Sequence, residues 1–160
     1  MHLRLAADLL FRSWFALATA IVVAGSLYDN DTFRLLDQQP SPRVASSAFG
    51  VYDCGGFVPT TEVDLVPGET FGWRLEVPDG QPIMWREELV LPSAPARWSG
   101  ANFVDIRDDG RTAVTAGVDT PFGGELAHAW AITEGDPPGE YELRLWLDGR
   151  LHEIYRFHVQ

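Results

Sequence analysis

The sequence predicts an all-β domain, an antiparallel β-sandwich, preceded by one hydrophobic N-terminal helix. From residue 44 onward, apolar and polar residues alternate with a period of two, and turn sequences separate these stretches about every ten residues. No helical hydrophobic pattern appears after residue 40. The 160 residues suffice for one such domain with a short extension. We therefore expect a transmembrane anchor or signal peptide at residues 1–28, a linker at 29–44 and the β-sandwich at 45–160.

The strand signal is clearest at residues 71–77, where every second residue is apolar. Further strands are expected at residues 83–91, 103–107, 111–115 and 125–133. Asp108-Asp109-Gly110 supplies a hairpin turn between the second and third of these.

The last hairpin turns at Asp148-Gly149, a sequence that favours a two-residue primed turn. Strict pairing across this turn gives two favourable cross-strand pairs, Arg144 with Glu153 and Leu143 with Ile154. It also sets Leu145 opposite His152, which is poor for a buried face. A β-bulge after the turn would remove this conflict and return Phe157 and Val159 to the core.

The N-terminal segment Leu9–Tyr28 is apolar and measures about 30 Å as a helix, which matches the hydrocarbon core of a bilayer. Trp14 and Tyr28 would then lie near the two membrane interfaces. We favour a single-pass inner-membrane anchor with the C-terminal domain in the periplasm. The alternative is a signal peptide cleaved near Ser26, which would release the domain into the periplasm.

The charge balance is acidic, with 23 Asp and Glu against 12 Lys and Arg. Such a surface repels phosphate backbones, so we expect no nucleic-acid partner. Cys54 is the single cysteine, which excludes an intrachain disulfide. We expect it to be a buried, inert thiol, with a bridge to another chain as the alternative.

The sequence offers no catalytic constellation and no cofactor motif. Serine lacks the G-x-S-x-G setting, and no glycine loop opens a helix. His152 and His158 are about 20 Å apart along one strand, too far to share a metal ion. Glu87 and Glu88 point to opposite faces of a strand and cannot act as a catalytic pair. We therefore predict no catalytic, cofactor-binding or metal-binding residues.

The tryptophans are the most informative side chains. Trp73 and Trp130 alternate with apolar residues and are expected in the core. Trp146 shares its strand face with polar neighbours, and Trp98 lies in a Pro- and Ala-rich loop. Exposed tryptophans anchor protein interfaces or stack on sugars. We predict that Trp98 and Trp146 bind a partner, together with Trp14 and Tyr28 of the N-terminal segment.

Three stretches carry a family resemblance: Ser47–Asp53, Thr60–Val77 and Pro137–Val159. Their FG-x-Y, FG-x-R and W-x-(D/G)-x-R motifs resemble an uncharacterised bacterial family of exported immunoglobulin-like domains of unknown function. The likeness covers most of residues 45–159, whereas Pro92 to Gly124 departs from the pattern. The resemblance implies an immunoglobulin-like sandwich and export, and it transfers no catalytic residue.

Two functional hypotheses follow. The first is a non-enzymatic accessory subunit that is anchored in the membrane and stabilises a larger membrane protein complex, for example an energy-transducing complex. The second is a secreted periplasmic module that binds a glycan or another small ligand through an exposed tryptophan.

Overall fold

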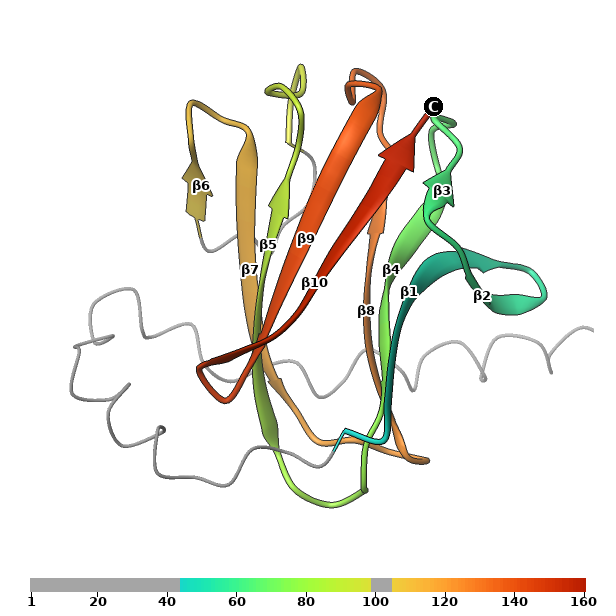
Figure 1. The fold of residues 1–160 in the computed structure, drawn as a ribbon, viewed down its shortest axis with the longest axis vertical. Coiled ribbons are helices and arrows are strands. Elements are labelled where there is room, and N and C mark those ends of the chain that lie inside the picture. Colours follow the sequence, from blue (N-terminus) through green and yellow to red (C-terminus); the bar gives the residue numbers. More distant parts are fainter. Residues whose placement is uncertain (1–43, 99–104) are drawn as a thin grey trace, which may run out of the picture. The chain divides into compact units, whose positions relative to one another are not determined.

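The computed structural model describes residues 44–98 and 105–160, which form a β-sandwich (Figure 1). Its strands are β1 (Ser46–Asp53), β2 (Gly56–Pro59), β3 (Glu62–Val63), β4 (Thr70–Glu76), β5 (Ile83–Val90), β6 (Asp105–Arg107), β7 (Thr112–Asp119), β8 (Glu125–Ala131), β9 (Gly139–Leu147) and β10 (Arg150–Val159).

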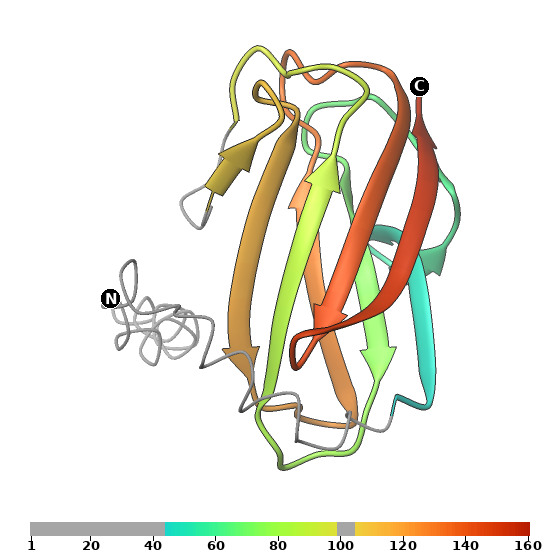
Figure 2. The same cartoon turned by 60° about the vertical axis from the view of Figure 1, so that its left-hand side comes forward.

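The strands form two facing sheets, and Figure 2 shows the six-stranded sheet in front of the other. One sheet has four strands in the order β2-β1-β4-β8, and the other has six in the order β3-β10-β9-β5-β7-β6. The pairs are antiparallel, except that the short β3 runs parallel to β10. This confirms the predicted all-β sandwich.

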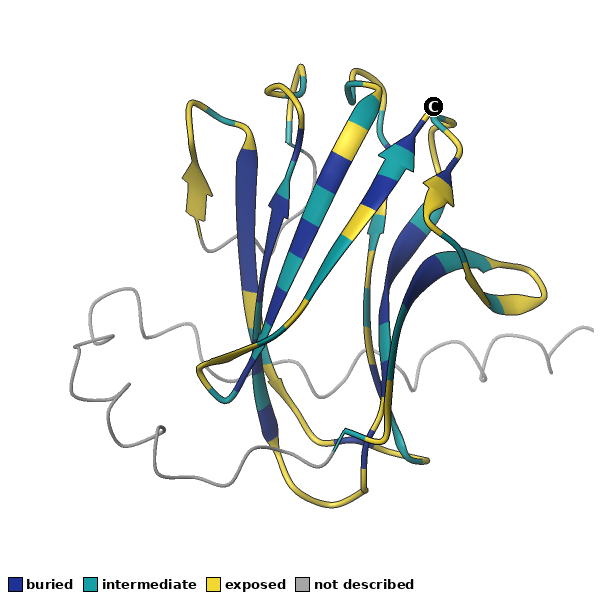
Figure 3. Ribbon diagram, in the orientation of Figure 1, coloured by how far each residue is buried: buried dark blue, intermediate teal, exposed yellow. Residues whose placement is uncertain are grey.

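The core fills the space between the sheets with alternate residues of each strand, visible in Figure 3 as alternating buried and intermediate bands along β9. Phe49 stacks on Phe157 across the sandwich with ring centroids 4.2 Å apart. Each fully buried large apolar side chain contributes about 1.5–3 kcal/mol relative to exposure. The buried apolar residues include Trp73, Leu75, Leu143, Leu145, Phe71, Phe157 and Val159.

The predicted strands at residues 71–77, 83–91 and 125–133 are confirmed as β4, β5 and β8, within a residue or two at their ends. The predicted hairpin around Asp108-Asp109-Gly110 is confirmed as β6 and β7, although residues 103 and 104 lie outside the described residues. Trp73 is fully buried as expected, whereas Trp130 is partly buried and packs against the core.

The last hairpin contains the predicted bulge. Asp148 and Gly149 have φ of 47° and 78°, as a primed turn requires. The register shifts between Leu151 and Glu153, so His152 is the extra residue of the bulge. Phe157 and Val159 are thereby buried, as predicted.

The bulge also overturns two predicted cross-strand pairs. Because His152 has no partner on β9, Arg144 lies opposite Ile154 rather than Glu153. Leu143 likewise lies opposite Tyr155 rather than Ile154. One inserted residue moves every later residue of β10 by one position, which favours burial of the aromatic residues over the predicted ion pair.

Several predictions concern residues outside the described ones, apart from Val44 itself. They are the hydrophobic helix, the boundaries at residues 28 and 44, and partner binding by Trp14 and Tyr28. Among the residues that the structure describes, no helix has the length and hydropathy to cross a membrane.

Candidate functional site

The outer face of the six-stranded sheet carries an apolar surface around Trp146. Trp146 of β9 lies opposite Leu151 of β10, and Met84 of β5 lies opposite Val118 of β7. Val118 is 64% exposed and Leu151 is 53% exposed. The guanidinium carbon of Arg86 lies 4.6 Å from the centroid of the Trp146 ring, a cation–π contact that fixes the indole. We call these five residues the Trp146 face.

Beside the Trp146 face, five charged residues form a continuous row across β6, β5, β9 and β10, which we call the arginine ladder. Its members, in order across the sheet, are Arg107, Glu88, Arg144, Glu142 and Arg156. Successive members are joined by N···O contacts of 3.2, 3.4, 2.6 and 2.9 Å. Arg86 contacts Glu88 as well, so it links the ladder to the Trp146 face.

The carboxylates of the ladder lie beneath the guanidiniums. Glu88 and Glu142 are 11% and 20% exposed, whereas Arg144 and Arg156 are 40% and 71% exposed. Burial alone would raise the pKa of Glu142, but the hydrogen bonds and charges of Arg144 and Arg156 outweigh burial and hold that pKa below its ordinary value. Glu142 is therefore a stable anion that orients both arginines.

A second polar cluster lies inside the sandwich around Glu87, whose side chain is fully buried. Trp73 Nε1 donates to Glu87 Oε2 over 2.5 Å, and Thr115 Oγ1 donates to Glu87 Oε1 over 2.8 Å. His128 Nδ1 lies 2.7 Å from the same Oε1, although the approach is out of line for a hydrogen bond. A buried carboxylate is costly unless it is bonded in this way, so these partners are what make Glu87 tolerable in the core.

His128 closes the Glu87 cluster toward solvent because β8 is an edge strand of its sheet. Its side chain is 28% exposed. The Trp85 ring lies 4.7 Å from the His128 ring, and Trp130 meets it edge-on at 6.1 Å. Trp85 Nε1 in turn donates to Asp119 over 2.6 Å. Aromatic rings and polar side chains thus surround Glu87 inside the sandwich.

Trp98 is half-buried rather than presented on the surface. Its Nε1 donates to the Gly110 carbonyl over 2.7 Å, and its ring meets Trp130 edge-on at 6.3 Å. The cavity beside it has a volume of about 20 Å³, room for roughly one water molecule. An open groove of about 500 Å³, lined in part by Arg74, Glu76 and Glu125, lies elsewhere, between the start of β1 and the β7–β8 loop.

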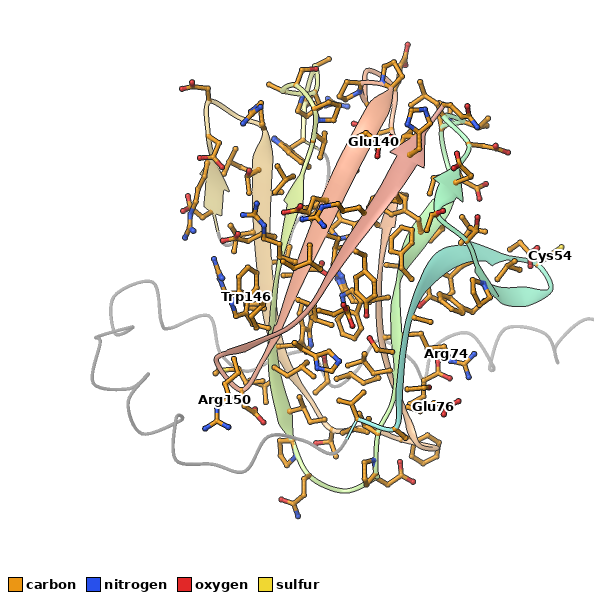
Figure 4. All side chains as sticks on the ribbon, in the orientation of Figure 1. Cys54, Arg74, Glu76, Glu140, Trp146 and Arg150 are labelled. Carbon is orange, nitrogen blue, oxygen red and sulfur yellow. The ribbon has the colours of Figure 1, made fainter. Side chains whose placement is uncertain are left out.

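Cys54 is exposed at the turn between β1 and β2, so the prediction of a buried thiol is wrong (Figure 4). The turn raises it away from both sheets, and Gly55 N donates to the Asp53 side chain to close that turn. Figure 4 places Cys54 far from Trp146, at the opposite side of the view. A disulfide bridge to another chain stays a prediction.

Sequence reasoning placed Glu87 and Glu88 on opposite faces but missed that both are buried. The alternation of residues along β5 indicates that Glu87 is buried, because it shares a strand face with the core residues Trp85 and Leu89. Glu88 left no such signal, since arginines from three other positions cover it only after folding. Among the described residues, no group of three or more His, Cys, Asp or Glu could hold a metal ion.

Comparison with solved structures defines the class of protein. The immunoglobulin-like protein PA1606 from Pseudomonas aeruginosa matches with a TM-score of 0.53 and 21% identity, over 77% of this chain and 99% of that one. The alkylpurine DNA glycosylase AlkC from Pseudomonas fluorescens, bound to DNA containing an abasic site analog, reaches a TM-score of only 0.38 at 11% identity. That match covers 80% of this chain and 33% of AlkC, and it is too low to show a shared fold. No curated protein matches the chain.

The described fold is therefore an immunoglobulin-like β-sandwich. A family model described as "PM0630 beta sandwich domain" matches residues 47–160, and the chain belongs to this family. The predicted resemblance to an uncharacterised immunoglobulin-like family is confirmed. A further mark of the class is a tyrosine corner, in which Tyr141 of β9 donates its hydroxyl to the Pro137 carbonyl over 2.7 Å.

Proposed function

We propose that the protein is a non-enzymatic accessory subunit that is anchored in the inner membrane and stabilises a larger membrane protein complex, for example an energy-transducing complex. In this proposal the segment Leu9–Tyr28 holds the chain in the bilayer, and the periplasmic sandwich contacts its partner through the Trp146 face. The fold supports a binding role, since immunoglobulin-like sandwiches are generally non-enzymatic. Fold alone names no partner, so the proposal depends on the surface.

The exposed apolar pairs of the Trp146 face carry this proposal. Val118 and Leu151 expose more than half of their area on the same face of one sheet, with Trp146 between them and Arg86 in contact with its ring. A tryptophan that is already fixed loses little conformational entropy on binding, and such residues dominate the energetics of interfaces. The four strands beneath it supply a rigid base, which favours a stable contact over an adaptable one.

A glycan or small-ligand site is the alternative, and the surroundings of the two tryptophans support it less well. Trp98 is packed beside a cavity of about 20 Å³, which is smaller than any sugar ring needs. One face of the Trp146 ring is covered by the Arg86 guanidinium. Tryptophan fluorescence titrated with cell-wall sugars tests this alternative, and a saturable shift would favour it.

The proposed function is tested with the full-length chain at natural abundance, solubilised in mild detergent. A photo-crosslinking residue is placed at position 118 or 151, and at Phe122 as the matched control, because Phe122 is 93% exposed but lies in the β7–β8 loop. We expect positions 118 and 151 to crosslink to one and the same membrane protein, and position 122 to give no such product.

Native electrophoresis supplies the second half of this test. The wild-type chain should migrate within a complex, and the double variant Val118→Ser, Leu151→Ser should migrate free, with an unchanged near-ultraviolet circular dichroism spectrum. Phe122→Ser should keep the complex. A wild-type chain that migrates as a lone monomer would overturn the proposed function.

A further inference from the structure

The face that carries the arginine ladder does not share the acidic charge of the whole protein. The chain carries a formal net charge of −11. On this face, however, four arginines meet four acids, counting Arg86, Asp105 and Glu140 with the ladder. An otherwise acidic molecule thus gathers guanidiniums on one sheet face, next to its exposed apolar surface.

The guanidiniums of this face are also more exposed than the two carboxylates of the arginine ladder. The side chains of Arg86, Arg107, Arg144 and Arg156 are 29%, 47%, 40% and 71% exposed. Glu88 and Glu142 lie below them at 11% and 20%, where they hold the guanidiniums in place. A planar guanidinium has five N–H donors, so one or two bonds to a carboxylate beneath it leave others for a partner above. Above Glu88 and Glu142, an approaching molecule would therefore meet N–H donors before it met carboxylates, whereas the side chains of Asp105 and Glu140 are 47% and 76% exposed.

We infer that the arginine ladder and the Trp146 face together bind an acidic protein segment, in which Asp or Glu side chains alternate with apolar ones. The carboxylates would bond to the guanidiniums of Arg144 and Arg156, and the apolar side chains would cover Trp146 and Leu151. Charge complementarity carries this choice of partner. The inference rests on the proposed function, because it names the chemistry of the partner at that same surface.

A second copy of this chain fits the surface less well. A two-fold dimer that set the exposed guanidiniums of one copy against those of the other would be repulsive. A basic peptide would meet the same repulsion. An acidic partner is the one class that both the charge and the apolar surface favour.

The experiment uses the full chain in an uncharged detergent and two fluorescent peptides, one alternating Glu with Leu and one alternating Lys with Leu. We expect the Glu peptide to bind with saturable anisotropy that weakens as salt is raised, and the Lys peptide not to bind. Arg156→Gln should weaken binding of the Glu peptide about threefold, the scale of one exposed ion pair.

Arg74→Gln is the matched control. Arg74 is 39% exposed, pairs with Glu125 and lies on β4 of the other sheet, so this variant changes the net charge equally while leaving the ladder intact (Figure 4). Equal weakening by Arg74→Gln and Arg156→Gln would overturn the inference, because it would show attraction that is not specific to this face. Tighter binding of the Lys peptide, or a dimer that Arg156→Gln dissociates, would overturn it as well.

The outcomes also separate this inference from the proposed function. If the native complex resists high salt and Arg156→Gln but is lost in Val118→Ser, Leu151→Ser, the accessory function stands and the acidic partner is wrong. If the chain binds the Glu peptide at this face but joins no complex in its membrane, the ligand chemistry stands and the proposed function fails.

Discussion

Glu87 and Glu88 are neighbours on β5, and both are buried, but on opposite faces of the same sheet. Glu87 accepts hydrogen bonds from Trp73 and Thr115 inside the sandwich, whereas Glu88 lies under arginines on the outside. Glu87 therefore stabilises the core, whereas Glu88 orients the arginines on the surface. Variants at the two positions should separate these roles.

Glu87→Ala should lower the free energy of unfolding by about 3 kcal/mol. The change leaves the Trp73 and Thr115 donors buried without an acceptor and opens space in the core, and losses of one partner in a buried polar pair are of this size. Urea unfolding followed by tryptophan fluorescence measures it. Glu134→Ala, at an exposed position in the β8–β9 connection, is the control and should change stability by less than about 0.5 kcal/mol. Equal effects of the two would show that the Glu87 cluster is not stabilising.

Gly72→Ala should destabilise the sandwich by about 2–3 kcal/mol. A Cβ atom at Gly72 would lie 2.1 Å from the His128 carbonyl oxygen on the neighbouring strand, so β4 and β8 would have to separate. Gly55→Ala is the matched control, because its Cβ would meet only the Asp53 side chain, in an exposed turn. Thermal unfolding of both variants decides the matter, and a Gly72 variant as stable as the Gly55 variant would contradict the close approach of β4 and β8.

Tyr141→Phe should cost about 1–2 kcal/mol, because the Pro137 carbonyl then loses its hydrogen bond in a partly buried corner. Burial also raises the pKa of the Tyr141 hydroxyl above its ordinary value. Ultraviolet titration of the native protein should therefore show this tyrosine ionising only at strongly alkaline pH. Ionisation of every tyrosine near pH 10 in the folded state would contradict the corner.

Much of the fold could be predicted because its signals are local. The period of two along β4 and β9, and the Asp148-Gly149 turn, depend on neighbouring residues alone. The bulge was predictable for a different reason, since strict pairing conflicted with burial of Phe157 and Val159. The cross-strand pairs were predicted wrongly, because pairing Arg144 with Glu153 assumes a hairpin without a bulge.

The site was harder to predict because its contacts join distant strands. Thr115 is 28 residues from Glu87, and Arg144 is 56 residues from Glu88. No local pattern shows that these side chains meet, so the partners of both buried acids could not be predicted. Cys54 was misplaced although a signal existed: Gly55 and Gly56 follow it, and such a pair favours a turn that lifts its neighbours into solvent.

Cys54 should react completely with a thiol reagent in the folded protein, because it is exposed at the β1–β2 turn. We expect one thiol per chain to be titrated at the same rate with and without denaturant, once the intrinsic effect of urea on the reagent is subtracted. A thiol that reacts only after unfolding would restore the prediction of a buried cysteine.

His152 should make the protein lose stability on mild acidification. Burial lowers the pKa of its imidazole below the ordinary 6.5, an effect that the charge of Glu153 only partly offsets, and its Nε2 has no hydrogen-bond partner among the described residues. Below pH 6.5 the unfolded chain therefore binds a proton that the folded state resists. The neutral imidazole therefore leaves the free energy of unfolding at its full value above this pH. That free energy decreases as the pH falls toward the folded-state pKa of His152.

Replacing His152 with Gln removes this proton linkage, so the urea midpoint of His152→Gln should fall less than that of the wild type between pH 7.5 and about pH 5. His158→Gln is the matched control on the same strand, where the imidazole Nδ1 lies 2.8 Å from Glu140 at an exposed ion pair. If both variants flatten the pH dependence equally, the loss belongs to imidazoles in general. If only His152→Gln flattens the pH dependence, the loss of stability in acid comes from the His152 imidazole. The bulge that returns Phe157 and Val159 to the core then also buries a group that destabilises the fold at low pH.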